Sequence, residues 1–306
     1  MTTIIPTAAT ARTFADLINE VIAQLQGYVR DQEKSTYLRA SCDTDDLILS
    51  VPAGVTLSPG IIEVDYELMW VESVDTTNGL LTVAPFGRGQ QGTTAASHAE
   101  NARVVFNPRL PKLRVARAIN DTLASMGRDL PALATTTITA NAAVITYQMP
   151  TGTRQILDCS WQAPGVTEAW VPIRSYQLDS NANTTEFTTG KSVSIFDDVV
   201  PGQTIQVVYT KDPTPLSSDD DTFSETGLQA TALDCVQYGA CYRLVGFSDA
   251  GRIDYKSVEA DLLDEPNQFG SAQALSRYFF QLHKSRLDEE ARRFWDANQP
   301  RIRWTR

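Results

Sequence analysis

The chain has 306 residues, 42% of them apolar, which is enough to bury a full hydrophobic core and to build two or three domains of ordinary size. Its formal net charge of -11 is uneven, because residues 277–306 carry +4 and the preceding 276 residues carry -15. This composition excludes a disordered chain and a general nucleic-acid binder, since binding by phosphate neutralisation needs a basic surface.

The first predicted element is a helix over residues 13–30. Thr13 and Asp16 have the spacing of a capping box, and apolar residues from Phe14 to Tyr28 keep the helical period. Residues 1–13 lack the features of a signal peptide, and no apolar run reaches 18 residues. The four cysteines show no paired spacing. We therefore expect a soluble protein made in a reducing cytoplasm, without a membrane partner, a metal or another cofactor.

Short β-like runs follow within residues 41–107. They lie at residues 47–49, 61–64, 68–71 and 80–83. Asn78 and Gly79 between the last two runs predict a hairpin with a type I′ turn, which needs positive φ at both central positions. The sequence therefore predicts a small antiparallel β module in this segment.

The loop that closes this module contains a glycine pattern, Gly87-Arg88-Gly89-Gln90-Gln91-Gly92, that formally matches a dinucleotide-binding fingerprint. A true fingerprint opens a helix in a parallel unit and is followed by an acidic residue about 20 positions on. Here a hairpin precedes the glycines and the region near Lys112 is basic. We therefore do not expect nucleotide binding.

The same loop resembles the R-G-x-x-G-T-x-A-x-x-H loop of a small β module found in bacteriophage virion proteins, and the resemblance covers residues 45–106. The glycines allow a tight backbone, and His98 is expected to bond loop carbonyls rather than to bind a metal or catalyse. The expected structural-loop residues are Arg88, Gly89, Gly92, Thr93 and His98.

Two helices and a second β-rich segment come next. Pro111 opens a predicted helix over residues 110–127, and residues 134–216 have the strand spacing of a five- or six-stranded sandwich. The acidic run 219–221 lacks the glycine and distal glutamate of a calcium loop, so it predicts the start of a helix over residues 224–247. A short helix over 252–263 and a long one over 271–296 follow.

This order predicts an α+β fold, in which one helical bundle carries two inserted antiparallel β modules and an extended C-terminal tail. The expected segments are bundle helix 1 (1–40), the small β module (41–107), bundle helix 2 (108–133), the sandwich-like module (134–216), bundle helices 3 and 4 (217–299) and the tail (300–306).

The C-terminal tail has the composition of a docking segment. Pro300 ends the helix, and in an extended strand Ile302 and Trp304 point to the side opposite Arg301 and Arg303. One side can bury while the other pairs with acids. The expected docking residues are Phe294, Trp295, Pro300, Arg301, Ile302, Arg303, Trp304 and Arg306.

The last helix and its tail resemble those of the head-to-tail adaptor (connector or neck) proteins of tailed bacteriophages. The matching residues are Tyr278, Arg286, Glu289, Glu290, Arg292, Arg293, Pro300, Arg301 and Arg303. The resemblance implies a virion protein made in the host cytoplasm, forming a homo-oligomeric ring, a dodecamer, in the neck. It also implies that the C-terminal segments bind the portal protein, that a tail or neck stopper protein binds elsewhere, and that DNA passes the lumen without specific binding.

Two other functions stay open at this point. A tail-fibre or baseplate protein that binds a host receptor would have three-fold symmetry and surface aromatics on its β modules. Trp161 and Trp170, in the second β-rich segment, are expected to be core or rim aromatics rather than platforms for a sugar. An enzyme would have a convergent polar site, whose members need not be adjacent in sequence. No nucleophile and base can be named here, so we expect no enzymatic activity.

Overall fold

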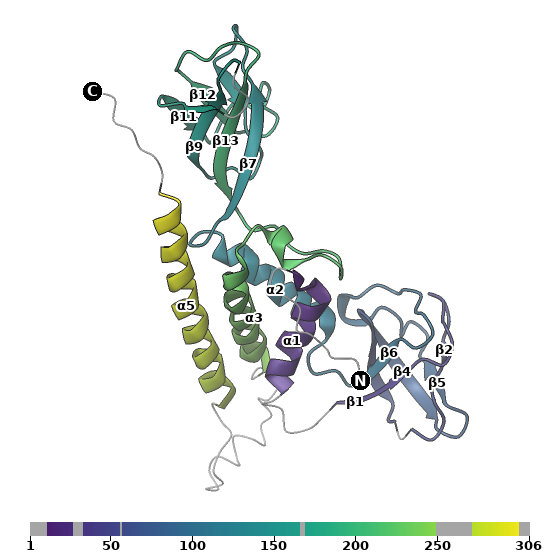
Figure 1. The fold of residues 1–306 in the computed structure, drawn as a ribbon. Helices are drawn as coiled ribbons and strands as arrows, with labels where there is room; N and C mark the ends of the chain where they lie inside the picture. Colours follow the sequence, from purple (N-terminus) through teal and green to yellow (C-terminus); the bar gives the residue numbers. More distant parts are fainter. Residues whose placement is uncertain (1–10, 27–32, 56, 166–168, 249–270, 300–306) are drawn as a thin grey trace, which may run out of the picture. The chain divides into compact units, whose positions relative to one another are not determined.

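The computed structural model describes residues 11–26, 33–55, 57–165, 169–248 and 271–299. These residues form thirteen β-strands in three sheets and four α-helices (Figure 1). None of the helices in these ranges is long and apolar enough to cross a membrane. The helices are α1 (Phe14–Gln26), α2 (Lys112–Met126), α3 (Leu233–Ser248) and α5 (Ser271–Ala297).

The first sheet has six antiparallel strands in the order β1-β6-β3-β4-β5-β2. Its inner face is a core of aliphatic residues from every strand except β1, including Ile62, Met69 and Leu81. The Arg39 N–H donates to the Ser50 carbonyl at 2.8 Å, so the two edges approach each other and the sheet forms a half-barrel. The strands are β1 (Lys34–Tyr37), β2 (Ile48–Ser50), β3 (Gly60–Val64), β4 (Glu67–Asp75), β5 (Leu80–Val83) and β6 (Arg103–Phe106).

The predicted hairpin between β4 and β5 is confirmed, but its turn type is wrong. Only Gly79 has positive φ, 68°, whereas a type I′ turn needs it at Asn78 as well. The Asp75 carboxylate accepts hydrogen bonds from the backbone N–H groups of Thr77 and Asn78, which fixes a longer turn.

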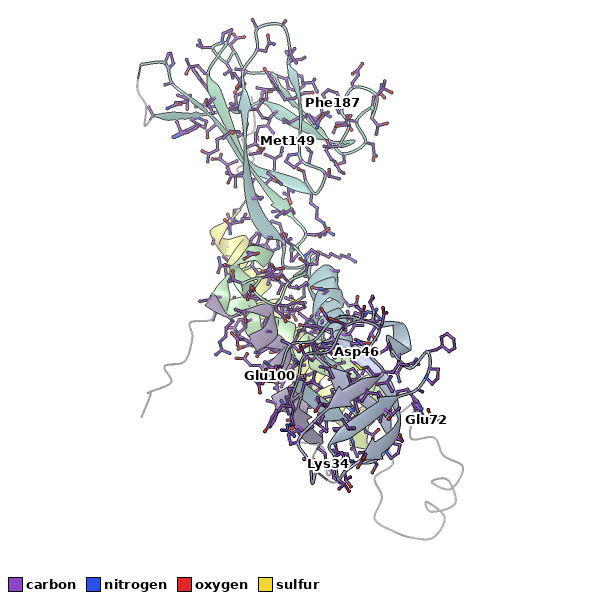
Figure 2. The ribbon with its side chains drawn as sticks, turned by 90° about the vertical axis from the view of Figure 1, so that its right-hand side faces the viewer. Lys34, Asp46, Glu72, Glu100, Met149 and Phe187 are labelled. Atoms are coloured by element: carbon purple, nitrogen blue, oxygen red, sulfur yellow. The ribbon has the colours of Figure 1, made fainter. Side chains whose placement is uncertain are left out.

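The second β segment is a sandwich of two sheets, with strand orders β10-β9-β13-β7 and β11-β12-β8. Its core includes Met149, which is buried inside the sandwich (Figure 2). The sequence predicted a sandwich of five or six strands, whereas the structure has seven, and neither β8 nor β11 was expected as a separate strand. The strands are β7 (Ala132–Thr139), β8 (Thr146–Gln148), β9 (Gln155–Gln162), β10 (Trp170–Pro172), β11 (Tyr176–Asp179), β12 (Ser192–Ile195) and β13 (Thr204–Lys211).

The predicted fold class, a helical bundle carrying β insertions, is wrong. The described chain is rich in strands, and each β segment has its own hydrophobic core. The chain also divides into two compact units. The first contains Met1–Ala15, Asn120–Gly239 and Tyr278–Arg306, and the second contains Asp16–Ile119 and Ala240–Arg277. A boundary between the two units falls inside each of the four helices, so the helices do not form one separate helical domain. The segment boundaries expected from the sequence stay predictions.

The helix expected over residues 224–247 begins later than predicted. Residues Phe223–Thr226 and Ala230–Ala232 form separate 3₁₀ turns, and α3 starts only at Leu233. Gly227 has φ of 78°, a left-handed conformation that interrupts a right-handed helix. The long last helix is confirmed as α5, whereas the short helix expected over 252–263 lies outside the described residues.

All four cysteines are buried as free thiols. Burial raises the pKa of Cys42, and it raises those of Cys159, Cys235 and Cys241 to about 12. These thiols therefore stay protonated and pack as small apolar side chains.

Candidate functional site

The loop that the sequence singled out is organised around Glu67, a buried residue at the start of β4. Arg88 pairs with both of its carboxylate oxygens, through Nε at 2.7 Å and Nη2 at 2.9 Å. The same guanidinium donates to the backbone carbonyls of Asp43, Asp46 and Ala96. One arginine therefore ties the loop, β4 and the segment before β2 together.

His98 occupies the other side of the same carboxylate. Its Nε2 lies 2.9 Å from Glu67 Oε2, and its Nδ1 lies 2.8 Å from Asp65 Oδ2. The sequence predicted that the ring would bond loop carbonyls, and the structure instead gives it two carboxylates. The backbone of His98 is also fixed, because it exchanges hydrogen bonds with Cys42 in both directions.

The backbone of the loop completes the coordination of Glu67. The N–H groups of Gly89 and Ala96 each donate to its carboxylate at 3.0 Å. Gly89 has φ of 62°, and a Cβ there would lie 3.1 Å from the Thr93 carbonyl oxygen. Thr93 accepts a hydrogen bond from the Leu68 N–H and donates to the Gln90 carbonyl, whereas Gly92, with φ of 80°, faces open space.

Charge in this cluster is set by the hydrogen bonds. Burial raises the pKa of Glu67, but hydrogen bonds from His98, Arg88 and two backbone N–H groups outweigh it and lower the pKa to about 2. Burial lowers the pKa of His98, but the bonds with Asp65 and Glu67 outweigh it and raise the pKa to about 9. At neutral pH the cluster therefore contains an imidazolium and a guanidinium around one buried carboxylate.

This geometry holds a loop in place and leaves the imidazole no free nitrogen. Because both ring nitrogens donate to carboxylates, the ring has no lone pair for a metal or for a substrate proton. An open groove of about 440 Å³ runs beside it, lined by Asp65, Tyr66, Thr93 and Ser97 and, from α2, by Leu113 and Arg117.

Sequence reasoning brought together Arg88, Gly89, Thr93 and His98 but missed the residue that joins them. Glu67 shares the inward register of β4 with Met69 and Val71, both fully buried. A buried carboxylate needs cationic partners, so the acidic residue at a core-facing position of this strand could have predicted the pairing with Arg88 and His98. The structural role expected for the loop residues stays a prediction.

A second buried carboxylate, Glu290, lies on α5. It accepts a hydrogen bond from the Thr231 hydroxyl at 2.6 Å and pairs with Arg286 and Arg293, which lie one helical turn to either side. The acid therefore fixes α5 against the turn that precedes α3.

The expected docking residues differ in their surroundings. Phe294 is buried and meets Trp295 edge-to-face, with ring centroids 5.1 Å apart, while Trp295 is partly exposed. The Asn298 backbone and side-chain amides both donate to the Phe294 carbonyl, just beyond the end of α5. Pro300, Arg301, Ile302, Arg303, Trp304 and Arg306 lie outside the described residues, so their docking role stays a prediction.

Comparison with known proteins gives one family. Residues 93–293 match the family model described as SU10 adaptor protein, a segment well over half of the chain. The match begins at Thr93, in the loop whose residues surround Glu67. It includes α2, the sandwich and α3, and it ends within α5. No curated protein sequence matches the chain.

Proposed function

The chain belongs to the SU10 adaptor protein family and is a structural adaptor of bacteriophages, and we propose that copies of it form a ring under the portal, joining the DNA-filled head to the tail. The family match is the observation that carries this proposal. The ring would be dodecameric and lie in the virion neck, with a tail or neck stopper protein as its other partner.

The C-terminal residues 300–306 are the proposed contact with the portal. An extended Ile302 and Trp304 would anchor one side, while Arg301 and Arg303 would pair with acids. Around a ring the same modest contact is repeated, so avidity makes the joint strong without a single tight site.

DNA would pass the ring without specific binding. The first 276 residues carry -15 and the whole chain carries -11, so the protein as a whole repels phosphates rather than retaining them. A pore that conducts DNA benefits from such a surface, because attraction would slow its passage.

The proposal is tested by removing residues 300–306 in a phage that carries this gene. The truncated protein should melt at the wild-type temperature yet leave filled heads without tails, and Trp304→Ala should cause much of the same defect. Thr305→Ala is the matched control and should join heads to tails normally. Truncated protein that joins them at normal yield would overturn the docking role.

One observation favours a second candidate, a tail-fibre or baseplate protein that binds a receptor. The sandwich exposes Trp170 and Phe196, the kind of surface aromatics that such a protein needs. Symmetry separates the two functions, because negative-stain images of the purified assembly would show three-fold particles for a fibre and a many-fold ring for an adaptor.

A further inference from the structure

The turn that follows β5 holds a phenylalanine in a conformation that suits glycine. Gly87 donates its N–H to the Ala84 carbonyl at 2.7 Å, which places Pro85 second and Phe86 third in a four-residue turn. Phe86 has φ of 62°, and the third position of such a Pro-led turn favours glycine or asparagine. Its side chain is 96% exposed, so packing within the described chain does not offset this strain.

The same turn lies against the backbone of Trp70, on β4. The Ala84 N–H donates to the Trp70 carbonyl at 2.9 Å, and the Trp70 N–H donates to the Gly87 carbonyl at 2.7 Å. Trp70 is 48% exposed, whereas the next residue, Val71, is fully buried, so the indole lies on the outer face of the sheet. Two exposed aromatic side chains are therefore held on neighbouring backbone.

The outer face continues across β5 and β2. Ile48 of β2 pairs with Thr82 of β5, so the two side chains lie on the same face of the sheet. Leu80 lies two residues before Thr82 and therefore shares this outer face. Both Ile48 and Leu80 are exposed. Glu72, at the irregularity in β4, also lies on the outer side of the sheet (Figure 2). We call this set the Phe86 surface; its members are Ile48, Trp70, Glu72, Leu80 and Phe86.

Charge in this part of the chain is divided between two stretches. Residues 40–87 contain eight acidic residues and no lysine or arginine, whereas residues 103–117 contain five lysines and arginines and no acid. Asp65 pairs with His98 and the buried Glu67 pairs with Arg88, whereas Asp46 and Glu72 are exposed and have no ion pair of this kind in the described chain. In the basic stretch Arg114 and Arg117 are exposed on the first half of α2.

We infer that the Phe86 surface of one copy binds the basic stretch 103–117 of a second copy. The inference rests on the proposed ring and names its contact. Two like surfaces facing each other would place Glu72 against Glu72, whereas a head-to-tail contact pairs it with arginines. A head-to-tail contact can also close into a ring. Guanidinium groups also stack favourably on indole and phenyl faces. Trp70 and Phe86 are then the anchors, and the strain at Phe86 is offset only when copies associate.

Phe86→Gly separates this role from a structural one. Glycine suits the turn, so the variant should melt at or above the wild-type temperature, while sedimentation should show self-association weakened by about thirtyfold, the effect of removing an interface anchor. Phe196→Ala, which removes an exposed aromatic from the sandwich, is the control and should associate normally. A variant that melts lower and associates normally would assign Phe86 to the fold and overturn the inference.

A charge exchange tests the partner stretch. Glu72→Arg and Arg117→Glu should each weaken association, and the two changes combined in one chain should restore it. Failure of the combined variant to recover, or wild-type protein that stays monomeric up to about 1 mM, overturns the inference. If Phe86→Gly protein forms rings of normal size, the inference is overturned but the proposed function stands. The proposed function is overturned if virions that lack the protein still acquire tails.

Discussion

The carboxylate of Glu67 and the guanidinium of Arg88 form a two-point pair, with Nε and Nη2 each donating to a different oxygen. The residues lie 21 positions apart, one on β4 and the other in the loop. Both side chains are nearly inaccessible to solvent, so each charge depends on the other for its solvation.

Glu67→Gln should therefore destabilise the first β module strongly. The change leaves the guanidinium of Arg88 and the imidazolium of His98 without their shared counter-charge, and breaking a buried pair in this way costs about 3–5 kcal/mol. Urea denaturation would measure the loss. Glu72→Gln, on the exposed side of the same strand, is the control and should change stability by less than about 0.5 kcal/mol.

His98 gives the module a dependence on alkaline pH. Its pKa is about 9 in the fold against 6.5 ordinarily, so its contribution is fully present below pH 6.5 and is lost as pH rises through 9. His98→Gln should cost on the order of 3 kcal/mol at pH 6, where Glu67 stays ionised, and much less at pH 10. If His98→Gln lowers the free energy of unfolding by the same amount at both pH values, packing and not charge explains the effect.

Glu63 predicts a second loss of stability with rising pH, over a more acidic range. It accepts the Lys112 N–H at 2.6 Å, but burial raises its pKa from 4.5 to about 7, so ionisation destabilises the fold as pH rises between these values. Glu63→Gln keeps an acceptor without the charge. It should be nearly neutral at pH 4.5 and stabilising by on the order of 3 kcal/mol at pH 8. Loss of stability at pH 8 would mean that the anion's attraction to the start of α2 exceeds its desolvation cost.

The charge distribution predicts weak association with DNA. At physiological salt the purified protein should bind duplex DNA more weakly than the 10⁻⁴ to 10⁻⁶ M that is roughly typical of non-specific binders. A gel-shift titration at two salt concentrations would measure it. Micromolar, salt-sensitive binding would contradict the expected passage of DNA without retention.

Local patterns predicted individual elements well. The runs that became β3 and β5 combine β-branched and aliphatic residues between turn signals, and α2 and α5 keep the helical period over several turns. These signals need only neighbouring residues. They also identified the loop, because the glycines and Arg88 lie within one short segment.

Long-range relationships could not be predicted in this way. Thr204 of β13 pairs with Thr139 of β7, and nothing in either strand specifies the other. The fold class was wrong for this reason, since helices were taken as the organising core while the pairing of distant strands was not visible. Glu67 was missed likewise, because its partners come from the loop that follows the hairpin.

The buried cysteines have a consequence for the particle outside the cell. A released phage meets dissolved oxygen with no reductant to repair it, and thiolates are the species that oxidise. Thiols that are covered and hold their protons offer no such target, so copies packed side by side in a neck would not become cross-linked by ageing. Burial of the thiols inside each subunit would then protect the assembled copies from such cross-linking.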